Sequence, residues 1–405
     1  MKILVLNCGS SSVKFQLIET GLEEIARNQD RILVRGLVEK IGSPDSIVSC
    51  TIREHSLRYN KPISSHKEAL STVFDSMTGH PEVLTGPEEI GGVGHRIVHG
   101  GEGFTRSALM EPSTIEKIEH AVELAPLHNS HNLEGFYAAR ELLPKAVHVA
   151  VFDTSFHHTL PPRAYLYGLP YDLYERHRVR RYGFHGTSHR YVSQRFAEIH
   201  GAPAESYKLI TCHLGNGCSV CAVDRGRSAD TSMGFTPLEG LLMGTRSGDL
   251  DPGALLYLMS KARLGIKDAN HLLNEESGLY GLSGLSRDMR ELLSQREKGK
   301  ERAGLAIDTF CYRVKKYIGA YFAVLNGADA VIFTGGIGEN APSLRAQICE
   351  SLGALGISLN TERNQAAVGV ETDITADDAR TRVWVIPTNE ELLIARDTLA
   401  CILSS

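Results

Sequence analysis

The sequence has 405 residues, of which 42% are hydrophobic and 22% charged, and its formal net charge is −5 at pH 7. This is the balance of a globular protein that is large enough for two or three domains with substantial cores. The acidic balance argues against nucleic-acid and polybasic membrane-surface partners, and no apolar run approaches the roughly 18 residues of a membrane helix. We therefore expect no nucleic-acid partner and no membrane association.

The start of the chain and the cysteines both indicate a cytoplasmic protein. The first apolar stretch, residues 3–7, is too short for the core of a signal peptide. The eight cysteines are scattered, so a secreted disulfide framework is not expected. Cys218 and Cys221 have the spacing of metal ligands, but they lie in a strand-like run without a second such pair, which favours buried thiols over a zinc site.

Two predicted β-hairpins share one design. Residues 3–18 form two strand-like runs around the small-residue turn Gly9-Ser10-Ser11-Ser12, and residues 209–223 form two around Leu214-Gly215-Asn216-Gly217. They lie about 200 residues apart, and this weak internal repeat suggests two similar domains.

The remaining elements mix helices with strands, which predicts the α/β class. Six stretches have the apolar periodicity that is typical of helices, namely 113–123, 129–142, 188–199, 252–263, 300–326 and 342–352. A strand at 330–334 runs into Gly335–Asn340, and a tail strand at 382–386 precedes Thr388–Glu391, a capping box in front of a helix to Leu403. Residues 265–300 and 355–380 show no clear pattern.

The two hairpin turns carry groups that suit phosphate oxygens. The first offers Asn7, three serine hydroxyls, Lys14 and several backbone N–H groups. An ordinary hairpin turn is the alternative, but it does not need so many polar groups. The glycines of the second turn, His213–Gly217, let the backbone approach an anion closely.

The third turn, Thr334–Asn340, follows a strand and precedes a helix. It lacks both the G-x-G-x-x-G spacing and the acidic partner of a dinucleotide-binding fingerprint, and the chain contains no G-x-x-x-x-G-K-[ST] motif. We interpret it as a nucleotide loop of another kind.

Four charged residues stand in contexts that favour function. Arg96 lies on a strand beside glycines, and arginine is the natural bidentate partner of a carboxylate, although a solvated surface arginine is the alternative. Asp153 follows the apolar run 147–152, where it either binds a ligand at a strand end or caps a helix, and both interpretations remain open. His185 and Arg246 lie in glycine-rich segments of the kind that commonly bind ligands, and a structural role is the alternative for both.

Taken in order, these segments resemble the acetate kinase family. The resemblance rests on Asn7–Lys14, His95–Gly101, Val151–His157, Gly183–His189, His213–Gly217, Met243–Asp249 and Thr334–Asn340, which together span nearly the whole chain. The wider superfamily includes sugar kinases, actin and heat-shock chaperone ATPases. The resemblance implies two ribonuclease H-like (actin-like ATPase) domains, residues 1–153 plus 387–405 and residues 154–386, with a nucleotide cleft between them.

The resemblance also implies roles for individual residues. Arg96 and Arg246 match the substrate arginines, Asp153 matches the essential acidic residue, and His185 matches the histidine that stabilises the transferring phosphoryl group. The pocket for the acetate methyl group corresponds to Val98, Leu127, Phe184 and Pro237. Asn7 and Glu390 match the positions for Mg2+, with Mn2+ as a possible substitute.

The implied ATP contacts fall in four segments, with substrate and metal residues in the first domain and nucleotide residues mainly in the second. They are Ser10, Ser12 and Lys14; His213, Leu214, Gly215, Asn216 and Gly217; Asp288, Met289 and Arg290; and Gly336, Ile337, Gly338, Glu339 and Asn340.

The implied reaction is reversible, direct in-line transfer of the γ-phosphoryl group of ATP to acetate, giving acetyl phosphate and ADP, by a homodimer. Because a carboxylate is already ionised at neutral pH, the task is to hold two anions together with a positive clamp rather than to remove a proton. We therefore expect Asp153 to orient an arginine or a metal-bound water. The alternatives are a propionate or butyrate kinase with the same machinery, a sugar kinase with Asp153 as base, and a non-catalytic actin-like nucleotide switch, in which Arg96, His185 and Arg246 would have no purpose.

Overall fold

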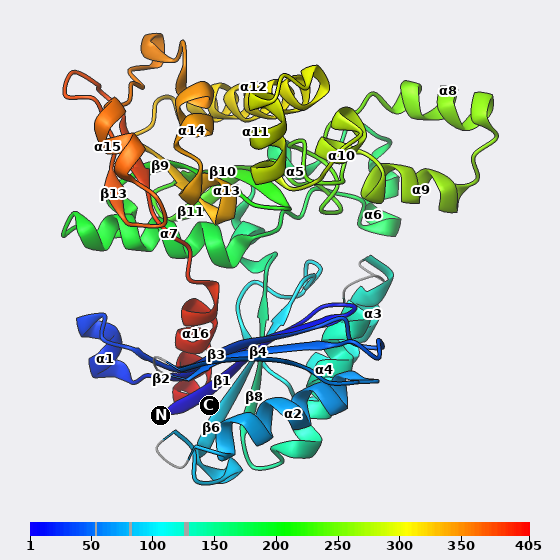
Figure 1. Ribbon diagram of the computed structural model, residues 1–405, viewed down its shortest axis with the longest axis vertical. Helices are drawn as coiled ribbons and strands as arrows, with labels where there is room; N and C mark the ends of the chain where they lie inside the picture. The colour runs from blue at the N-terminus through cyan, green and yellow to red at the C-terminus, as the bar shows by residue number, and fades with distance from the viewer. Residues whose placement is uncertain (53–54, 81–82, 125–128) are drawn as a thin grey trace. The chain divides into compact units, whose positions relative to one another are not determined.

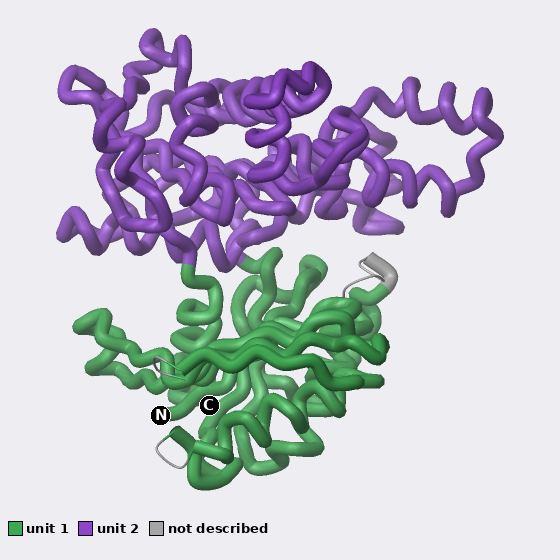
Figure 2. Tube along the Cα trace, in the orientation of Figure 1, with its two compact units in different colours: residues 1–155, 389–405 green, residues 156–388 purple. Residues whose placement is uncertain are grey.

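The computed structural model describes residues 1–52, 55–80, 83–124 and 129–405. The chain forms two compact units, residues 1–155 with 389–405 (unit 1) and residues 156–388 (unit 2), coloured separately in Figure 2. The chain leaves unit 1 after residue 155 and returns to it at residue 389, whereas the resemblance implied a change after residue 153 and a return at residue 387. Each unit contains one β-sheet with helices around it (Figure 1), which confirms the predicted α/β class. Within the described ranges, no helix combines the length and the apolarity needed to cross a bilayer.

The sheet of unit 1 has eight strands. Their order across the sheet is β5 (His55–Asn60), β4 (Ile47–Ile52), β3 (Arg31–Glu39), β2 (Ser12–Glu19), β1 (Lys2–Cys8), β6 (Ile90–Ile97), β8 (Val147–Phe152) and β7 (Ala108–Leu109). Strand β1 pairs antiparallel with β2 and parallel with β6, and β6 pairs parallel with β8. The carboxyl ends of β1, β6 and β8 therefore lie at one edge of the sheet.

Helices cover this sheet on both faces. They are α2 (His66–Thr78), α3 (Pro112–His120), α4 (Asn129–Leu142) and α16 (Glu390–Ser404), whereas α1 (Leu22–Arg27) buries no residue. Apolar residues of α2 and α4 share one core cluster with Leu4 and Leu6 of β1. Helix α16 packs on the other face, against β1, β6 and β8.

Glycines of β6 allow α16 to lie against the strand. A Cβ atom at Gly94 would come 2.4 Å from Thr398 Oγ1 and 2.7 Å from Ile394 Cγ2. Because side chains alternate along a strand, Gly94 and Arg96 face the same side, toward α16. The glycine before Arg96 thus has a packing role, and it does not by itself mark a binding segment.

Unit 2 repeats the central strand order of unit 1. Its sheet runs β11 (Arg227–Thr231), β10 (Cys218–Asp224), β9 (Lys208–Leu214), β12 (Ala330–Thr334), β14 (Arg382–Val385) and β13 (Thr372–Asp373). An antiparallel hairpin, β9 with β10, is followed by parallel pairing of β9 with β12 and of β12 with β14. The same order, β2-β1-β6-β8, stands in unit 1, so the repeat predicted from the two hairpins is present in the fold.

Most helices of unit 2 lie around this sheet, whereas α8 (Pro252–Ala262) and α9 (Ile266–Glu275) project away from it (Figure 1). The others are α5 (Pro162–Tyr165), α6 (Tyr171–His177), α7 (Gly186–Ile199), α10 (Gly278–Ser283), α11 (Met289–Glu297), α12 (Glu301–Leu325), α13 (Gly335–Asn340), α14 (Pro342–Cys349) and α15 (Thr361–Ala366). Val192 and Phe196 of α7 pack with residues of β9, β10 and β12 in one core cluster. Cys218 and Cys221, on β10, are both buried free thiols, as predicted.

The predicted helices are present with small shifts at their ends, but three expectations need correction. Residues 265–300 and 355–380, which show no clear pattern, contain α9, α10, α11 and α15. The turn at Gly335–Asn340 is itself the short helix α13. The N-cap of α16 is Asn389, whose side chain accepts from the Leu392 N–H at 3.1 Å, so the capping box that begins at Thr388 is wrong.

Candidate active site

Unit 1 gathers three predicted site residues at the carboxyl ends of neighbouring parallel strands. Asn7 lies near the end of β1, Arg96 lies on β6, and Asp153 directly follows β8. This edge is the usual ligand position in open α/β sheets. The parallel order β1-β6-β8 is what brings these distant sequence positions together.

Arg96 and Asp153 form a bidentate ion pair. Arg96 Nη2 lies 2.5 Å from Asp153 Oδ2, and its Nε lies 3.1 Å from Oδ1. The remaining nitrogen, Nη1, donates to Asn7 Oδ1 at 3.3 Å. Burial acts to lower the pKa of Arg96, but the carboxylates of Asp153 and Glu390 outweigh it, so the pKa is raised. Arg96 is a permanent cation whose charge is already balanced by Asp153, which is only 1% exposed.

The two adjacent glutamates at the start of α16 have different surroundings. The charge of Glu390 acts on Arg96, as the raised pKa of that arginine shows. Glu391 is 8% exposed and pairs with Lys14 of β2, with 2.5 Å between Nζ and Oε1. Lys14, predicted to contact ATP, thus has a carboxylate partner within unit 1.

The donors near Arg96 suit magnesium. Asn7, Asp153 and Glu390 all offer oxygen atoms, and the hard cation Mg2+ prefers oxygen ligands. The predicted metal residues Asn7 and Glu390 therefore fit the ion by the chemistry of their donors.

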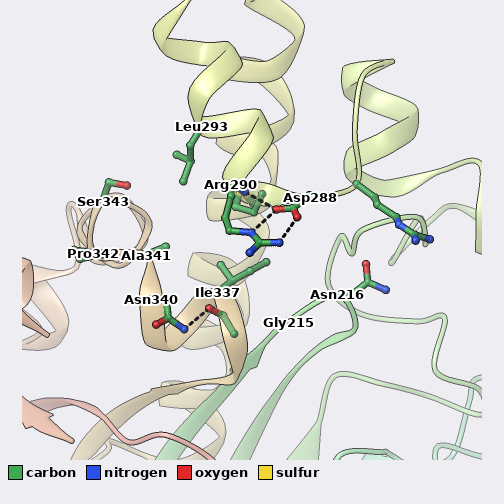
Figure 3. A pocket seen from close by; sticks show the side chains of 13 residues that line it. Gly215, Asn216, Asp288, Arg290, Leu293, Ile337, Asn340, Ala341, Pro342 and Ser343 are labelled. Atoms are coloured by element: carbon green, nitrogen blue, oxygen red, sulfur yellow. Dashed lines mark hydrogen bonds and ion pairs between the residues drawn. The ribbon is translucent and has the colours of Figure 1, made fainter. Parts of the chain in front are cut away.

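Unit 2 contains a cavity of about 780 Å3 between the β9–β10 turn, the start of α11 and the helices α13 and α14 (Figure 3). Such a volume is typical of small-molecule sites. Eight predicted ATP residues line it, namely Gly215, Asn216, Asp288, Met289, Arg290, Gly336, Ile337 and Asn340. The cavity thus joins three of the four sequence segments assigned to the nucleotide.

The other eight predicted ATP residues do not line this cavity: Ser10, Ser12 and Lys14 belong to unit 1, and His213, Leu214, Gly217, Gly338 and Glu339 belong to unit 2. Glu339 Oε1 accepts from the Gly335 N–H at 2.8 Å and from the Thr388 N–H at 3.0 Å, so its carboxylate holds the backbone. Gly338 is buried against Phe333 and Leu214. His213 and Gly217 lie instead beside His185, where a Cβ atom at Gly217 would come 3.5 Å from its ring.

His185 is held by a chain of hydrogen bonds. Its φ of 54° places it in the left-handed region at the start of α7, which costs a side chain like this about 1 kcal/mol. Its Nδ1 lies 2.9 Å from Ser219 Oγ, which also lies 2.7 Å from Nε2 of the buried His189. Burial, with the nearby His157 and His213, holds the pKa of His189 well below its usual range. A neutral His189 therefore fixes Ser219, and Ser219 fixes the ring of His185.

Arg246 also lies beside Gly217, with its Nη1 3.6 Å from where a Cβ atom at Gly217 would stand. Its Nη1 donates to the Pro237 carbonyl oxygen at 3.2 Å and approaches the sulfur of Met243 at 3.8 Å. Across the part of the chain that the structure describes, no carboxylate pairs with Arg246. Burial lowers its pKa, which marks a cation without a counter-ion. Such a group is prepared for an anionic ligand.

Comparison with known proteins places this geometry in a family. The sequence profile of the acetokinase family matches residues 2–396. The chain belongs to the acetokinase family. An acetate kinase of Chloroherpeton thalassium is 51% identical over 100% of this chain and 99% of its own length. A crystal structure of Porphyromonas gingivalis acetate kinase superposes with a TM-score of 0.92 at 43% identity over 99% of both chains. A propionate kinase from Francisella tularensis gives 0.91 at 41% identity, over 98% of this chain and 99% of its own.

The four residues predicted for the methyl pocket of this acetokinase are divided between the units. Val98 lies in unit 1, just past β6, and its N–H donates to Asn132 Oδ1. Phe184 and Pro237 lie in unit 2, next to His185 and in contact with Arg246 respectively. Leu127 lies outside the described residues.

Sequence reasoning missed further residues of the acetokinase cavity. Arg287, Leu293, Ala341, Pro342 and Ser343 also line it. Arg287 directly precedes one predicted segment and Ala341 directly follows another, so extending each segment by a few residues would have found most of them. Ser219 and His189 were missed because their role depends on β10 and α7 meeting around His185.

Proposed function

We propose that this chain transfers the terminal phosphoryl group of ATP to acetate, giving acetyl phosphate and ADP in a reversible in-line reaction. The observation that carries the proposal is Arg246, a half-buried guanidinium with no carboxylate partner among the described residues, set beside His185 and the Gly217 turn. The names of the relatives support the choice of acetate.

The proposed mechanism is one of charge neutralisation. Acetate is ionised at neutral pH, so no base has to generate the nucleophile. Arg246 and His185 stabilise the charge on the phosphoryl oxygens, and fixed donors of this kind need no reorganisation during the reaction. The nucleotide occupies the cavity lined by Asn216, Asp288 and Ile337.

In this proposal Asp153 positions Arg96 and carries no proton. Its two oxygens are already engaged by Arg96, which holds the guanidinium in one orientation. Arg96 then offers a fixed cation to an anionic substrate. Removing Arg96 would also leave a buried carboxylate without its partner, so Arg246 gives the cleaner test.

We further propose that Mg2+, or Mn2+, is held by Asn7 and Glu390. The ion supplies charge neutralisation for the phosphates of ATP. The eight cysteines are all free thiols, which supports a reducing compartment and the cytoplasm.

A homodimer completes the proposal. Helix α8 carries Leu256, Tyr257 and Leu258, all exposed, and Ile266 at the start of α9 is 84% exposed. The two helices form a projecting arm of unit 2 (Figure 1). A helix that is apolar on several faces requires a partner, and a second copy of the chain provides one.

The second candidate function is phosphoryl transfer to a carboxylate longer than acetate. It is favoured by the similarity to the propionate kinase from Francisella tularensis, which is nearly as high as that to Porphyromonas gingivalis acetate kinase. The same machinery would serve both substrates, and the size of the apolar pocket would separate them.

The test is ATP-dependent formation of an acyl phosphate, trapped as a hydroxamate, with acetate, propionate and butyrate. Wild-type enzyme should use acetate best. Arg246→Ala and His185→Ala should each lower kcat by on the order of 100-fold or more, with little change in nucleotide binding. Arg176→Ala removes an exposed arginine of the same unit and serves as the matched control. Wild-type kcat in Arg246→Ala would refute the proposed role, and preference for propionate would select the second candidate.

A further inference from the structure

A second cluster of ligating side chains lies in unit 1, beside the turn that carries Gly9 and Ser10. It consists of His66 at the start of α2 and of His131 and Glu134 on α4. His131 and Glu134 are three residues apart, so they occupy the same face of α4. One ligand atom from each of the three residues lies within 4.8 Å of the others.

The tautomer of His66 is set by the backbone. Its Nε2 lies 2.7 Å from the carbonyl oxygen of Gly9, and a carbonyl can only accept, so Nε2 carries the proton. Nδ1 then points at Glu134 Oε2, 3.3 Å away. Two acceptors face each other there unless a cation lies between them. A metal ion between the two atoms would satisfy both acceptors.

The distances match those of a metal site. Nδ1 of His66 and Nδ1 of His131 lie 3.3 Å and 3.2 Å from the same oxygen, Glu134 Oε2. Donors at about 2.0–2.1 Å from a tetrahedral zinc ion stand roughly 3.3–3.4 Å apart. Two of the distances between ligand atoms are therefore already those of a tetrahedral zinc site. His131 and Glu134 are 29% and 56% exposed, so both side chains can adjust.

The surroundings of the cluster also suit a metal. A histidine that ligates a metal usually donates its other ring N–H to a backbone carbonyl, as His66 does to Gly9. The three residues line a hollow of about 590 Å3, which leaves space for water as a fourth ligand.

We propose that His66, His131 and Glu134 bind a divalent transition-metal ion of the zinc, cobalt or nickel class. Two imidazoles and one carboxylate prefer such ions to Mg2+, which takes oxygen ligands. The site is separate from the donors proposed for magnesium. An ion bound there holds the His66 ring in place. Because this ring bonds the Gly9 carbonyl, the ion also holds the turn that carries Ser10.

The test uses the full chain after treatment with a chelator, with magnesium present in excess. Cobalt is titrated and followed by its visible absorption, and zinc is titrated by calorimetry. Wild type should bind one equivalent at this site, and zinc should raise its melting temperature because the ion binds only the folded state. His131→Ala and Glu134→Gln should each weaken binding by at least about tenfold. Glu134→Gln keeps the shape of an exposed side chain, so it guards against a folding defect.

His271→Ala is the matched control. His271 lies between Glu275 and Glu276 in an exposed cluster of the same residue types, but it faces them with different ring nitrogens. Cobalt binding should be unaffected by this change. Equal metal binding in wild type and Glu134→Gln would overturn the proposal and would leave an ion pair of His66 with Glu134. Loss of binding in His271→Ala alone would place the metal elsewhere.

Discussion

At the scale of single residues, the central feature is the hydrogen-bonded chain that ends on His185. Ser219 is fully buried and touches both His185 and His189. It has no route to the substrate except through His185, so it is a positioning residue. Because a hydroxyl has one proton and two lone pairs, it can bond both ring nitrogens at once.

Ser219→Ala should lower kcat about tenfold and leave the KM for ATP nearly unchanged, because the His185 ring loses its fixed orientation. The pH dependence of kcat should shift as well. Ser219→Cys, which keeps a weak donor, should restore part of the rate. Ser193→Ala removes another buried serine of unit 2, one that bonds only within its own helix, and should not alter kcat. An unchanged rate and pH profile in Ser219→Ala would contradict the positioning role.

The two glutamates of α16 should respond differently to substitution. Glu390→Gln should raise the Mg2+ concentration needed for half-maximal rate, since one charged oxygen donor is lost. Glu391→Gln should instead lower the melting temperature, because the side chain at this buried position loses its charged hydrogen bond with Lys14. Magnesium titration and thermal melting of both variants check this division, and the opposite pattern would contradict it.

His157 should make unit 2 sensitive to acid. Burial lowers its pKa to about 4, and its Nε2–H donates to the Phe184 carbonyl at 3.0 Å. Unfolded, it titrates near 6.5, so between these values the unfolded state binds more protons. The stability that neutral His157 contributes is present above pH 6.5 and is lost as pH falls toward 4, at roughly 1 kcal/mol per pH unit.

Urea unfolding of unit 2 at several pH values measures this slope. His157→Gln should flatten it, whereas His158→Gln, at the exposed neighbouring position, should leave it unchanged. Parallel slopes in wild type and His157→Gln would show that other groups cause the acid sensitivity.

At the scale of elements, α16 depends on the absence of side chains in β6. Gly94→Ala would place a methyl group 2.4 Å from Thr398 Oγ1, so either helix or strand must shift. Overpacking of this kind costs about 1–3 kcal/mol. Thermal melting should show the loss. Gly103→Ala, where a Cβ atom meets nothing within 4 Å, is the control, and an equal melting temperature in the two variants would exclude the packing argument.

The helices and strands also show how much of the fold could be predicted from the sequence. The hairpins, the long helices and the strands before Arg96 and Asp153 were predictable, because each has a local periodicity or a turn signature. The contact of Arg96 with Asp153 was not, because it depends on the order in which β1, β6 and β8 assemble. Helices α10 and α11 are short and carry little apolar periodicity, whereas α9 has Ile266, Ala269, Leu272 and Leu273 at helical spacing and could have been predicted.

The site residues also divide into those with a local sequence signal and those that depend on distant contacts. Segments that follow a strand, such as Gly215–Asn216 and Gly336–Asn340, could be identified from their own composition. The bond from the Thr388 N–H to the Glu339 carboxylate could not be predicted, because Thr388 is distant in the sequence. Lys14 similarly meets Glu391 only in the folded unit.

At the scale of the whole molecule, the exposed arm of α8 and α9 should control the number of chains in the assembly. Leu256→Arg should convert a dimer to a monomer, because a charged group cannot be buried without a partner. Light scattering coupled to size-exclusion chromatography measures the mass. Leu22→Arg, at a leucine of similar exposure in unit 1, should leave the mass unchanged. A dimer in Leu256→Arg would place the interface elsewhere.

The division of the chain bears on how the protein is made. Unit 1 is interrupted after residue 155, and its last part, residues 389–405, is translated only after all of unit 2. Domains generally fold as units while the chain emerges from the ribosome. Unit 2 is contiguous and can fold as soon as it is complete. Unit 1 must wait, with the face of β6 around Gly92 and Gly94 uncovered until α16 is synthesised. The nascent first unit is thus the stage at which chaperone protection would matter most.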